Sequence, residues 1–165
     1  MRLWVGITSV LLVLVYIVGS RRLVASDDQW YRALVRPPWQ PPGAVIGIVW
    51  MYNFTALFIA AVLVARHGSR WELVVWTVCL LTSIVAALLW AWLFYVQHAL
   101  FASSAALIVA AVLTVPLVIA AWGSVTWVGA LLVPYLLWVC IAASLAVGYV
   151  QRNADVSLLR GNTSR

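Results

Sequence analysis

Charged residues are scarce in this sequence. Asp, Glu and Arg make up only 8% of its 165 residues, and lysine does not occur at all. A soluble domain has about 25% charged residues, so this chain has too few to cover a water-facing surface. The rest is 66% hydrophobic, with a mean hydropathy of +1.07. This composition excludes a soluble globular protein and predicts an integral membrane protein.

Residues that commonly carry chemistry are also few. Cys79 and Cys140 lie deep inside apolar runs, which predicts small buried hydrophobic residues rather than a disulfide or a metal pair. His67 and His98 fall in different predicted connections on opposite sides of the membrane, with no second nitrogen or sulfur ligand nearby. We find no nucleophile–base pair and no phosphate-binding loop. The sequence therefore predicts neither an enzyme nor a metal site.

The predicted spans contain no acid or base that could relay protons, which argues against an ion-coupled transporter. The net charge of +6 comes from ten arginines against four acids. In a soluble protein this balance would suggest nucleic acid as a partner. Here the arginines flank apolar runs, where they anchor helices and contact anionic headgroups. We therefore expect membrane lipid, and no nucleic acid, as a partner.

Long apolar runs without alternation predict an all-α integral membrane protein with a bundle of five transmembrane helices, because barrel strands alternate polar and apolar residues. One crossing takes about 20 residues, so the uncharged stretch from 73 to 122 must hold two, divided near Gln97 and His98. The expected spans are residues 3–19, 44–65, 73–95, 99–121 and 127–150. They form one membrane domain over residues 1–165, with a lid loop at 20–43 and a polar tail at 151–165.

The arginines are distributed unevenly between the two sides of the predicted bundle. Seven occur in the first loop and the C-terminal tail, whereas three occur at the N-terminus and between the second and third spans. The positive-inside rule then places the first loop and the C-terminus in the cytoplasm, with the bundle in a bacterial cell membrane. Arg2 before an apolar core also resembles a signal peptide, but we interpret this segment as a membrane helix.

Tryptophan is unusually frequent, with 11 residues. Five lie near predicted span ends, where indole rings favour the membrane interface: Trp4, Trp30, Trp71, Trp122 and Trp127. Four fall within spans: Trp50, Trp76, Trp90 and Trp138. A buried indole N–H needs a partner, so the second group indicates either a polar-tipped cavity with a ligand, or plain packing and lipid contact.

Four stretches resemble the TspO/MBR family of tryptophan-rich sensory proteins and translocator proteins. Residues 30–42, WYRALVRPPWQPP, are similar to the family's W-Y-x-x-L-x-K-P-x-W-x-P-P, and VW follows at 49–50. LLWAWLFY at 88–95 is similar to N-x-x-W-x-x-x-F-F, and TWVGALLVPYLLW at 126–138 is similar to W-x-G-x-L-x-V-P-Y-L-x-W. The length, the order of the motifs and the five-span layout also match this family.

The resemblance implies a homodimer-prone bundle with a pocket under the first loop. The implied ligands are flat and hydrophobic: porphyrins, haem, sterols and synthetic benzodiazepine-site drugs. Such molecules stack on aromatic rings. No cofactor is implied as a requirement, and a porphyrin, haem or lipid is the expected bound molecule. By position in these motifs, the ligand-binding candidates are Tyr31, Trp39, Trp50, Trp90, Tyr135 and Trp138.

Three positions depart from the family pattern. Ser83 and Ala87 stand where the family has a glutamine and an asparagine, and Ala146 replaces an asparagine of the fifth span. Such amides hydrogen-bond ligands or helices for about 0.6–2 kcal/mol each, so their loss predicts a more apolar pocket and weaker recognition of porphyrin carboxylates. Asn53, one turn after Trp50, predicts either an interhelical hydrogen bond or a compensating ligand contact.

Two further patterns are less specific. Leu145, Tyr149 and Arg152 match the sterol pattern L/V-x₁₋₅-Y-x₁₋₅-K/R, which the family carries in the same place. An interfacial tyrosine beside a snorkelling arginine is the alternative interpretation. Small residues at every fourth position of the third span fit either a homodimer face or the bundle interior: Ser83, Ala87 and Ala91.

The segment at 30–42 predicts a stiff, extended lid, because proline fixes φ and resists helix formation. We expect Leu34 and the tryptophans to lean into the bundle mouth, with Arg36 stacked on Trp39. Pro41 and Pro42 then begin the second span, where missing N–H groups cost little.

Three hypotheses for the function follow. The first is a non-enzymatic membrane receptor or carrier for a tetrapyrrole, or for a sterol- or isoprenoid-like lipid, in a tryptophan-lined pocket. The second is an accessory subunit that packs against a larger membrane complex. The third, enzymatic turnover of porphyrin, has been suggested for the family, but this sequence shows no acid–base machinery for it. Saturable binding of protoporphyrin would favour the first over the second.

Overall fold

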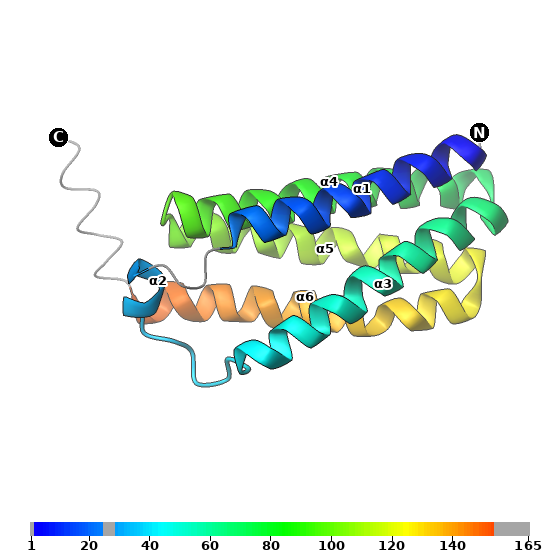
Figure 1. Cartoon of the computed structure of the whole chain (residues 1–165). Helices are drawn as coiled ribbons and strands as arrows, with labels where there is room; N and C mark the ends of the chain where they lie inside the picture. Colours follow the sequence, from blue (N-terminus) through cyan, green and yellow to red (C-terminus); the bar gives the residue numbers. More distant parts are fainter. Residues whose placement is uncertain (1, 25–28, 154–165) are drawn as a thin grey trace.

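The computed structural model of the protein describes residues 2–24 and 29–153, and over these residues every regular element is a helix (Figure 1). The short helix α2 (Gln29–Ala33) lies in the first loop, and the π-helical turn η1 (Trp92–Val96) continues α4. The long helices are α1 (Arg2–Leu23), α3 (Gly43–His67), α4 (Arg70–Ala91), α5 (Leu100–Ser124) and α6 (Thr126–Arg152). In the described chain, 5 segments are long and apolar enough to cross a membrane, with α4 and η1 forming one. The predicted fold class is confirmed.

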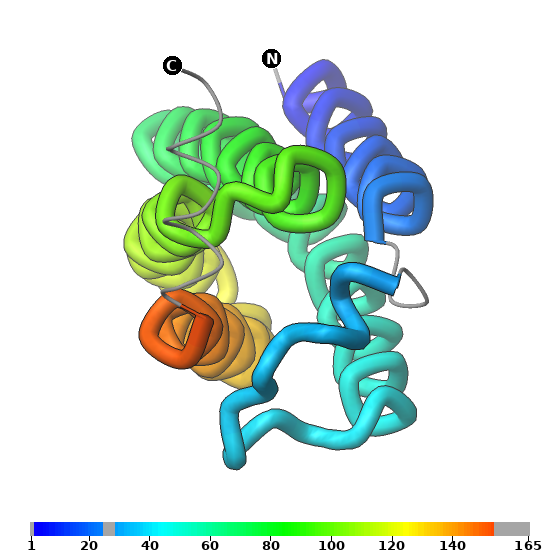
Figure 2. The backbone as a smooth tube through the Cα atoms, turned by 90° about the vertical axis from the view of Figure 1, so that its left-hand side faces the viewer, coloured from blue at the N-terminus to red at the C-terminus, as the bar shows by residue number. Residues whose placement is uncertain are grey.

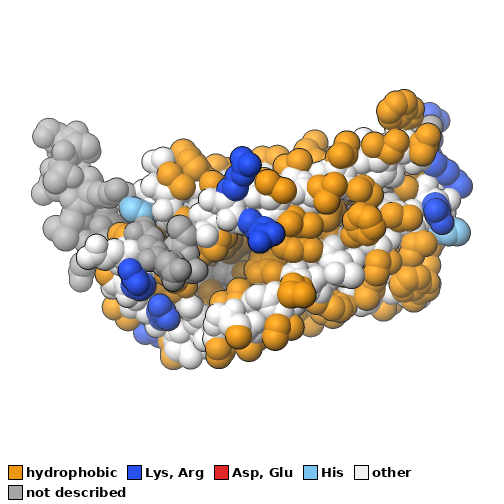
Figure 3. Space-filling model, viewed as in Figure 1, with side chains coloured by type: hydrophobic (Ala, Val, Ile, Leu, Met, Phe, Trp, Pro, Cys, Tyr) orange, Lys and Arg blue, Asp and Glu red, His pale blue; other side chains and the backbone are white. Residues whose placement is uncertain are grey.

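The five long helices form a closed ring in the order α1, α4, α5, α6 and α3 (Figure 2). Helix α3 closes the ring because it packs on both α1 and α6. Successive long helices run in opposite directions (Figure 1). The first loop, η1 and the end of α6 therefore gather at one end of the bundle, which we call the lid end. The start of α1 and the end of α3 lie at the other end, which we call the amino end. The outer surface between the two ends is largely hydrophobic (Figure 3).

Helix α1 extends past its predicted end at residue 19. Arg21 and Arg22 lie in its last turn, where cations interact favourably with the helix dipole. Helix α6 likewise continues to Arg152, and Asn153 caps it, so the polar tail predicted from residue 151 begins too early. The remainder of that tail, residues 154–165, lies outside the described residues.

Helix α4 begins before the predicted start of the third span at residue 73, because a capping box sets its first turn. The Ser69 N–H donates to the Glu72 carboxylate over 2.7 Å, and the Glu72 N–H donates to the Ser69 hydroxyl over 3.4 Å. The same carboxylate accepts a hydrogen bond from the Ser124 hydroxyl at the end of α5, over 3.3 Å. This acid therefore ties two helices together at the amino end.

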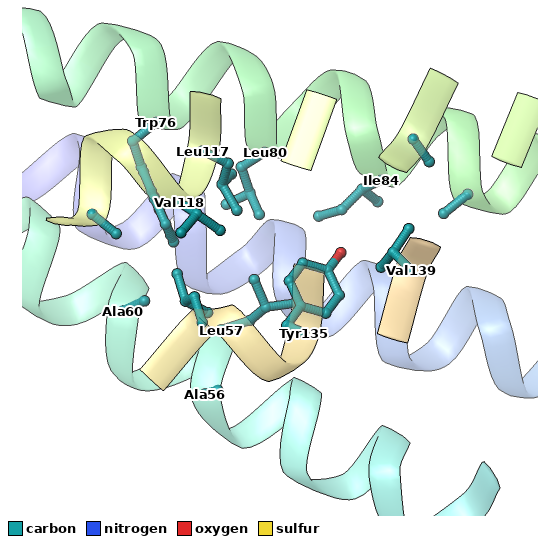
Figure 4. Packing of buried hydrophobic residues seen from close by; sticks show 14 of the residues in the cluster. Ala56, Leu57, Ala60, Trp76, Leu80, Ile84, Leu117, Val118, Tyr135 and Val139 are labelled. Atoms are coloured by element: carbon teal, nitrogen blue, oxygen red, sulfur yellow. The ribbon is translucent and has the colours of Figure 1, made fainter. Parts of the chain in front are cut away.

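The core lies along the middle of the ring. Large side chains from four helices meet there: Leu57, Trp76, Leu117 and Tyr135 (Figure 4). The buried alanines of α3 and α4 have short side chains, which allow the backbones of these helices to lie close to their neighbours. Lipid is as apolar as this core, so tight packing and hydrogen bonds, rather than the hydrophobic effect, hold membrane helices together.

The stripe of small residues on α4 lies inside the bundle. Ser83, Ala87 and Ala91 are only 2%, 6% and 2% exposed within a single chain. The interpretation of this stripe as a homodimer face is therefore wrong, and it serves the packing of α4 against its neighbours.

A buried hydrogen bond joins α4 to α1. Trp76 is fully buried, and its indole N–H donates to the hydroxyl of Ser9, also fully buried, over 3.1 Å. Helix α1 is otherwise the least enclosed of the spans, because only 17% of the residues in its most apolar stretch are buried. This bond therefore fixes the rotation of a helix that has few other polar contacts with the bundle.

We predict that Ser9→Ala lowers the unfolding free energy by about 1 kcal/mol, because the Trp76 N–H then has no acceptor in an apolar interior. Thermal unfolding of the purified protein in detergent measures the change. Ser144→Ala is the matched control, since that exposed hydroxyl bonds only to its own helix at the Ile141 carbonyl. Equal losses of stability in the two variants would contradict the prediction.

Candidate functional site: an aromatic cavity under the lid

A cavity of about 90 Å³ lies inside the lid end of the bundle. It is partly covered by residues 29–42 of the first loop, which we call the lid and which contribute Tyr31 and Gln40 to its wall. Most of its wall is aromatic: Tyr31 from the lid, Trp50 from α3, Trp90 from α4, Phe94 and Tyr95 from η1, and Trp138 and Tyr149 from α6. The wall is completed by Gln40, Ile46, Ala142, Leu145 and Ala146.

The π-helical turn explains how two consecutive residues, Phe94 and Tyr95, both reach the cavity. Its wide turn is closed by the Gln97 N–H, which donates to the Trp92 carbonyl over 3.0 Å. A π-turn holds more residues than an α-turn, so successive side chains diverge less. Phe94 is 3% exposed and packs edge-to-face on Tyr149, with ring centroids 5.4 Å apart.

Three polar side chains connect the lid to α6 across the cavity. The Gln40 amide donates to the Tyr31 hydroxyl over 3.1 Å, within the lid. The Tyr149 hydroxyl of α6 donates to the Gln40 carbonyl oxygen and also contacts the Tyr31 hydroxyl at 3.3 Å. These groups therefore satisfy one another while the lid is closed.

Two other polar groups of the wall have no such partner. The indole N–H groups of Trp90 and Trp138 are both buried, and neither donates to any described residue. An unpaired N–H in an apolar environment costs about 1–3 kcal/mol. Trp76 differs from these two residues, because its N–H is bonded to Ser9 and holds the fold, whereas the donors of Trp90 and Trp138 are left unpaired in side chains that line the cavity.

The lid is fastened to the end of α6 by Asn153. Its side-chain amide forms a pair of hydrogen bonds with the backbone of Val35. The Val35 N–H donates to Oδ1 over 2.9 Å, and Nδ2 donates to the Val35 carbonyl over 3.1 Å. Next to this pair, the lid lies directly on Gly148. A Cβ there would come within 2.9 Å of Pro37 and 2.8 Å of Trp39, so only glycine permits this approach.

The first part of the lid departs from the predicted extended form. Residues 29–33 make one short helix, α2, because the prolines that resist helix formation begin only at Pro37. Trp30 stacks on His98 with ring centroids 4.0 Å apart. Leu34 is 5% exposed and packs against Phe94 and Tyr149, as expected for a residue that leans into the bundle mouth.

The lid arginine does not stack on the predicted ring. Arg36 lies over Tyr31, with its guanidinium carbon 5.5 Å from the ring centroid, whereas Trp39 carries Arg152 of α6 at 5.6 Å. The predicted Arg36–Trp39 pair is therefore wrong. The two observed pairs place one cation above the cavity wall and a second between the lid and α6.

The structure brings together four of the predicted ligand-binding residues: Tyr31, Trp50, Trp90 and Trp138 all line the cavity. Trp39 does not, because it packs on Gly148 and Arg152 of α6 and is 46% exposed. Tyr135 belongs to the main core below the cavity, where it is 3% exposed (Figure 4).

Asn53 also lies away from the cavity wall. It is fully buried in α3, and neither polar atom of its amide has a hydrogen-bond partner among the described residues. The predicted interhelical hydrogen bond is therefore not formed, and the compensating contact to a ligand in this cavity is not supported by its position.

The family amide positions separate into two groups. Ala146 lines the cavity, so its methyl group makes the wall more apolar where an amide would have offered polar atoms. Ser83 and Ala87 are buried in α4 away from the wall. The Ser83 hydroxyl is satisfied by the Leu80 carbonyl of its own helix over 3.1 Å.

The sterol pattern at the end of α6 faces inward. Leu145 and Tyr149 line the cavity, and Tyr149 is 5% exposed, so its interpretation as an interfacial tyrosine is wrong. Arg152 is exposed and lies over Trp39. Leu145 and Tyr149 are thus placed to contact an occupant of the cavity, and Arg152 lies at the lid.

Sequence reasoning missed several residues of the site, although most lie inside the motifs already singled out. Gln40 is part of WYRALVRPPWQPP, and Phe94 and Tyr95 end LLWAWLFY. Asn153 was not indicated by any pattern, because it lies in the segment predicted as a polar tail.

The two cysteines were predicted to be buried. Cys79 is half-buried, but Cys140 is exposed on the outside of α6.

We predict that Asn153→Ala loosens the lid, because both hydrogen bonds to Val35 are lost. Two such bonds are worth about 1–3 kcal/mol, so amide hydrogen exchange of residues 34–40 should accelerate about 5- to 160-fold. Mass spectrometry of the exchanged protein measures it. Gln151→Ala, at an exposed neighbouring position, should leave the exchange unchanged, and unchanged exchange in Asn153→Ala would show that the pair does not hold the lid.

Comparison with known proteins shows the family of this chain. The TspO/MBR family profile matches residues 7–152. The chain is 33% identical over 133 residues to the human translocator protein, covering 78% of this chain and 77% of the relative. It is 29% identical over 119 residues to the tryptophan-rich sensory protein of Cereibacter sphaeroides, with 72% and 73% covered. It is 28% identical over 133 residues to protein CrtK of Rhodobacter capsulatus, with 77% and 80% covered. The chain is a multi-pass integral membrane protein and belongs to the TspO/MBR family.

Proposed function

We propose that the protein is a non-enzymatic membrane receptor or carrier that binds a flat hydrophobic ligand in the aromatic cavity and retains it under the lid. The observation that carries the proposal is the pair of buried, unpartnered indole N–H groups of Trp90 and Trp138 in the cavity wall. A fold stabilised by packing alone gains nothing from leaving two donors unpaired. A ligand with hydrogen-bond acceptors would satisfy both.

The wall chemistry supports a planar ligand. Indole, phenol and phenyl rings from four elements surround the cavity, and such faces stack on π-systems or on rigid fused rings. Tetrapyrroles and sterol- or isoprenoid-like lipids are the two ligand classes that match this wall. Relatives named as a sensory protein and a translocator protein are consistent with a receptor or carrier role.

The residues fit a tetrapyrrole ring better than they fit a ligated haem iron. No His, Cys or Met is among the lining residues of the described cavity, so the only side chains of this wall of a kind that ligates haem iron are Tyr31, Tyr95 and Tyr149. Carboxylates of a porphyrin would find cations only at the lid, where Arg36 and Arg152 lie over Tyr31 and Trp39. We therefore propose that a porphyrin would bind with its carboxylates toward the lid and that no cofactor is required.

The size of the cavity supports a gated mechanism. Sites for molecules of this kind have volumes of about 300–1,000 Å³, whereas this cavity holds about 90 Å³ with the lid in its present position. We therefore propose that ligand entry displaces the lid. Its hydrogen bonds to the bundle are few, namely Asn153 with Val35 and Tyr149 with Gln40, so a ligand that replaces these bonds and the aromatic packing of the lid can lift it.

We predict that Trp90→Phe and Trp138→Phe each weaken the binding of protoporphyrin about 3- to 30-fold, because each removes one donor and part of a stacking face. Quenching of the remaining tryptophan fluorescence in detergent measures the dissociation constant. Trp71→Phe is the control, since that ring is 74% exposed at the amino end.

The result also separates the two leading hypotheses. Saturable binding that weakens in the two cavity variants but not in Trp71→Phe supports the receptor or carrier. Non-saturable quenching, together with purification in a stoichiometric complex with another membrane protein, would replace the proposal with the accessory-subunit hypothesis. Size measurement of the purified protein would show in the same samples whether it is a homodimer.

We further predict that Gly148→Val speeds both association and dissociation of protoporphyrin, because a side chain there displaces Pro37 and Trp39 and holds the lid partly open. Stopped-flow fluorescence measures the two rates, and an increase of about tenfold in each corresponds to about 1.4 kcal/mol of lost lid contact. Ser144→Val is the control, because it places the same side chain at an exposed position of α6. Unchanged rates in Gly148→Val would show that the lid does not control entry.

A further inference from the structure

A second hollow lies at the amino end, far from the lid. It is an open groove of about 610 Å³ between the first half of α1 and the last turns of α3. Its wall is apolar along most of its length, and two arginines, Arg2 and Arg66, line one end of it. The aromatic cavity shares no lining residue with this groove.

Small residues create the groove. Gly6 of α1 lies so close to Ala65 of α3 that a Cβ on Gly6 would be 3.3 Å from the Ala65 Cβ. The backbones therefore approach at this point without filling the space beside them. Ile7 and Leu11 border that space and remain 43% and 55% exposed. The result is an open apolar groove on the outer surface of α1 and α3.

The length of the groove matches one leaflet of a bilayer. Its α1 wall runs from residue 2 to residue 11, which spans about 14 Å at about 1.5 Å per residue. Half of a hydrocarbon core of about 30 Å is about 15 Å. An acyl chain that lies in the groove would therefore end near the bilayer centre, with its headgroup at the two arginines.

The arginines at the mouth are held in place but not neutralised. The Arg2 guanidinium donates to the Arg66 carbonyl over 2.8 Å and to the Gly68 carbonyl over 3.4 Å, so it caps the end of α3. Within the described part of the chain, the one acid is Glu72, which is engaged by Ser69 and Ser124. Arginine side chains gather at this end of the molecule (Figure 3).

We propose that this groove binds an anionic phospholipid, with an acyl chain along α1 and α3 and the phosphate between Arg2 and Arg66. Guanidinium groups bind phosphate by charge-assisted hydrogen bonds. An apolar groove that ends at two unneutralised cations complements one acyl chain of a lipid whose headgroup is negatively charged. Zwitterionic lipids offer the same chain but carry a compensating cation, so the site distinguishes lipids by headgroup charge.

The test uses the purified full chain in detergent and native mass spectrometry, with palmitoyl-oleoyl phosphatidylglycerol as the anionic probe. Phosphatidylcholine with the same chains is the zwitterionic comparison. We expect the anionic lipid to bind about tenfold more tightly. Inorganic phosphate at matched concentration should not compete, because it lacks the chain. Equal affinity for both lipids, or displacement by phosphate alone, would overturn the proposal.

Variants locate the site. Arg66→Gln should reduce the preference for the anionic lipid several-fold and keep the fold, because the Arg2 bond uses only the backbone carbonyl of residue 66. Arg66→Lys should restore part of the preference. Arg70→Gln is the matched control, since Arg70 is exposed at the same end but does not line the groove.

A filling variant tests the apolar part of the groove. Ile7→Trp should weaken both phospholipids, because the larger side chain occupies the groove. Its thermal stability and its protoporphyrin affinity, measured in the same preparation, show whether the bundle and the aromatic cavity are intact. If Arg70→Gln lowered the lipid preference as much as Arg66→Gln, or if the Ile7→Trp protein bound both lipids normally, the groove would not be the site.

Discussion

The lid is held over the bundle by a pair of hydrogen bonds between the Asn153 side chain and the Val35 backbone. The rest of the candidate site depends on this pair. It fixes the first loop beside Gly148, which brings Tyr31 and Gln40 over the cavity and allows them to bond with Tyr149. The lid is otherwise connected to the bundle through aromatic packing on η1. An amide at the end of a helix thus links the lid to the bundle next to the cavity.

The tryptophans illustrate how one residue type serves several purposes in a membrane protein. Trp76 pairs its N–H with Ser9 and holds two helices in register. Trp4 and Trp71 are about three-quarters exposed, at 70% and 74%, at the amino end, where indole rings suit the interface. Trp90 and Trp138 keep their donors unpaired beside the cavity. These roles are distinguished by whether the indole N–H is hydrogen-bonded, and not by the position of the tryptophan within its predicted span.

Much of the fold followed from hydropathy and motifs, because the length of apolar runs is set by the thickness of the bilayer. The five spans were predicted within a few residues, and the motifs located Tyr31, Trp50, Trp90 and Trp138. Asn153 could not be predicted, since its partner is a backbone group 118 positions away. Asn53 was assigned a hydrogen bond from its chemistry alone, and the packing around it supplies none. The small residues of α4 were predicted to face either a second copy or the bundle interior. The choice between the two depends on the ring order of the helices, which no local pattern specifies.

The π-helical turn at η1 has a consequence for how this protein tolerates change. Its extra residue per turn resembles a one-residue insertion absorbed within a helix. The insertion shifts the helical register just before the chain reverses at His98, whose φ of 54° is left-handed. Deleting a residue here would restore regular α-helical winding and change which side chains of this turn face the cavity. The aromatic wall therefore depends on the number of residues in the turn as well as on their type.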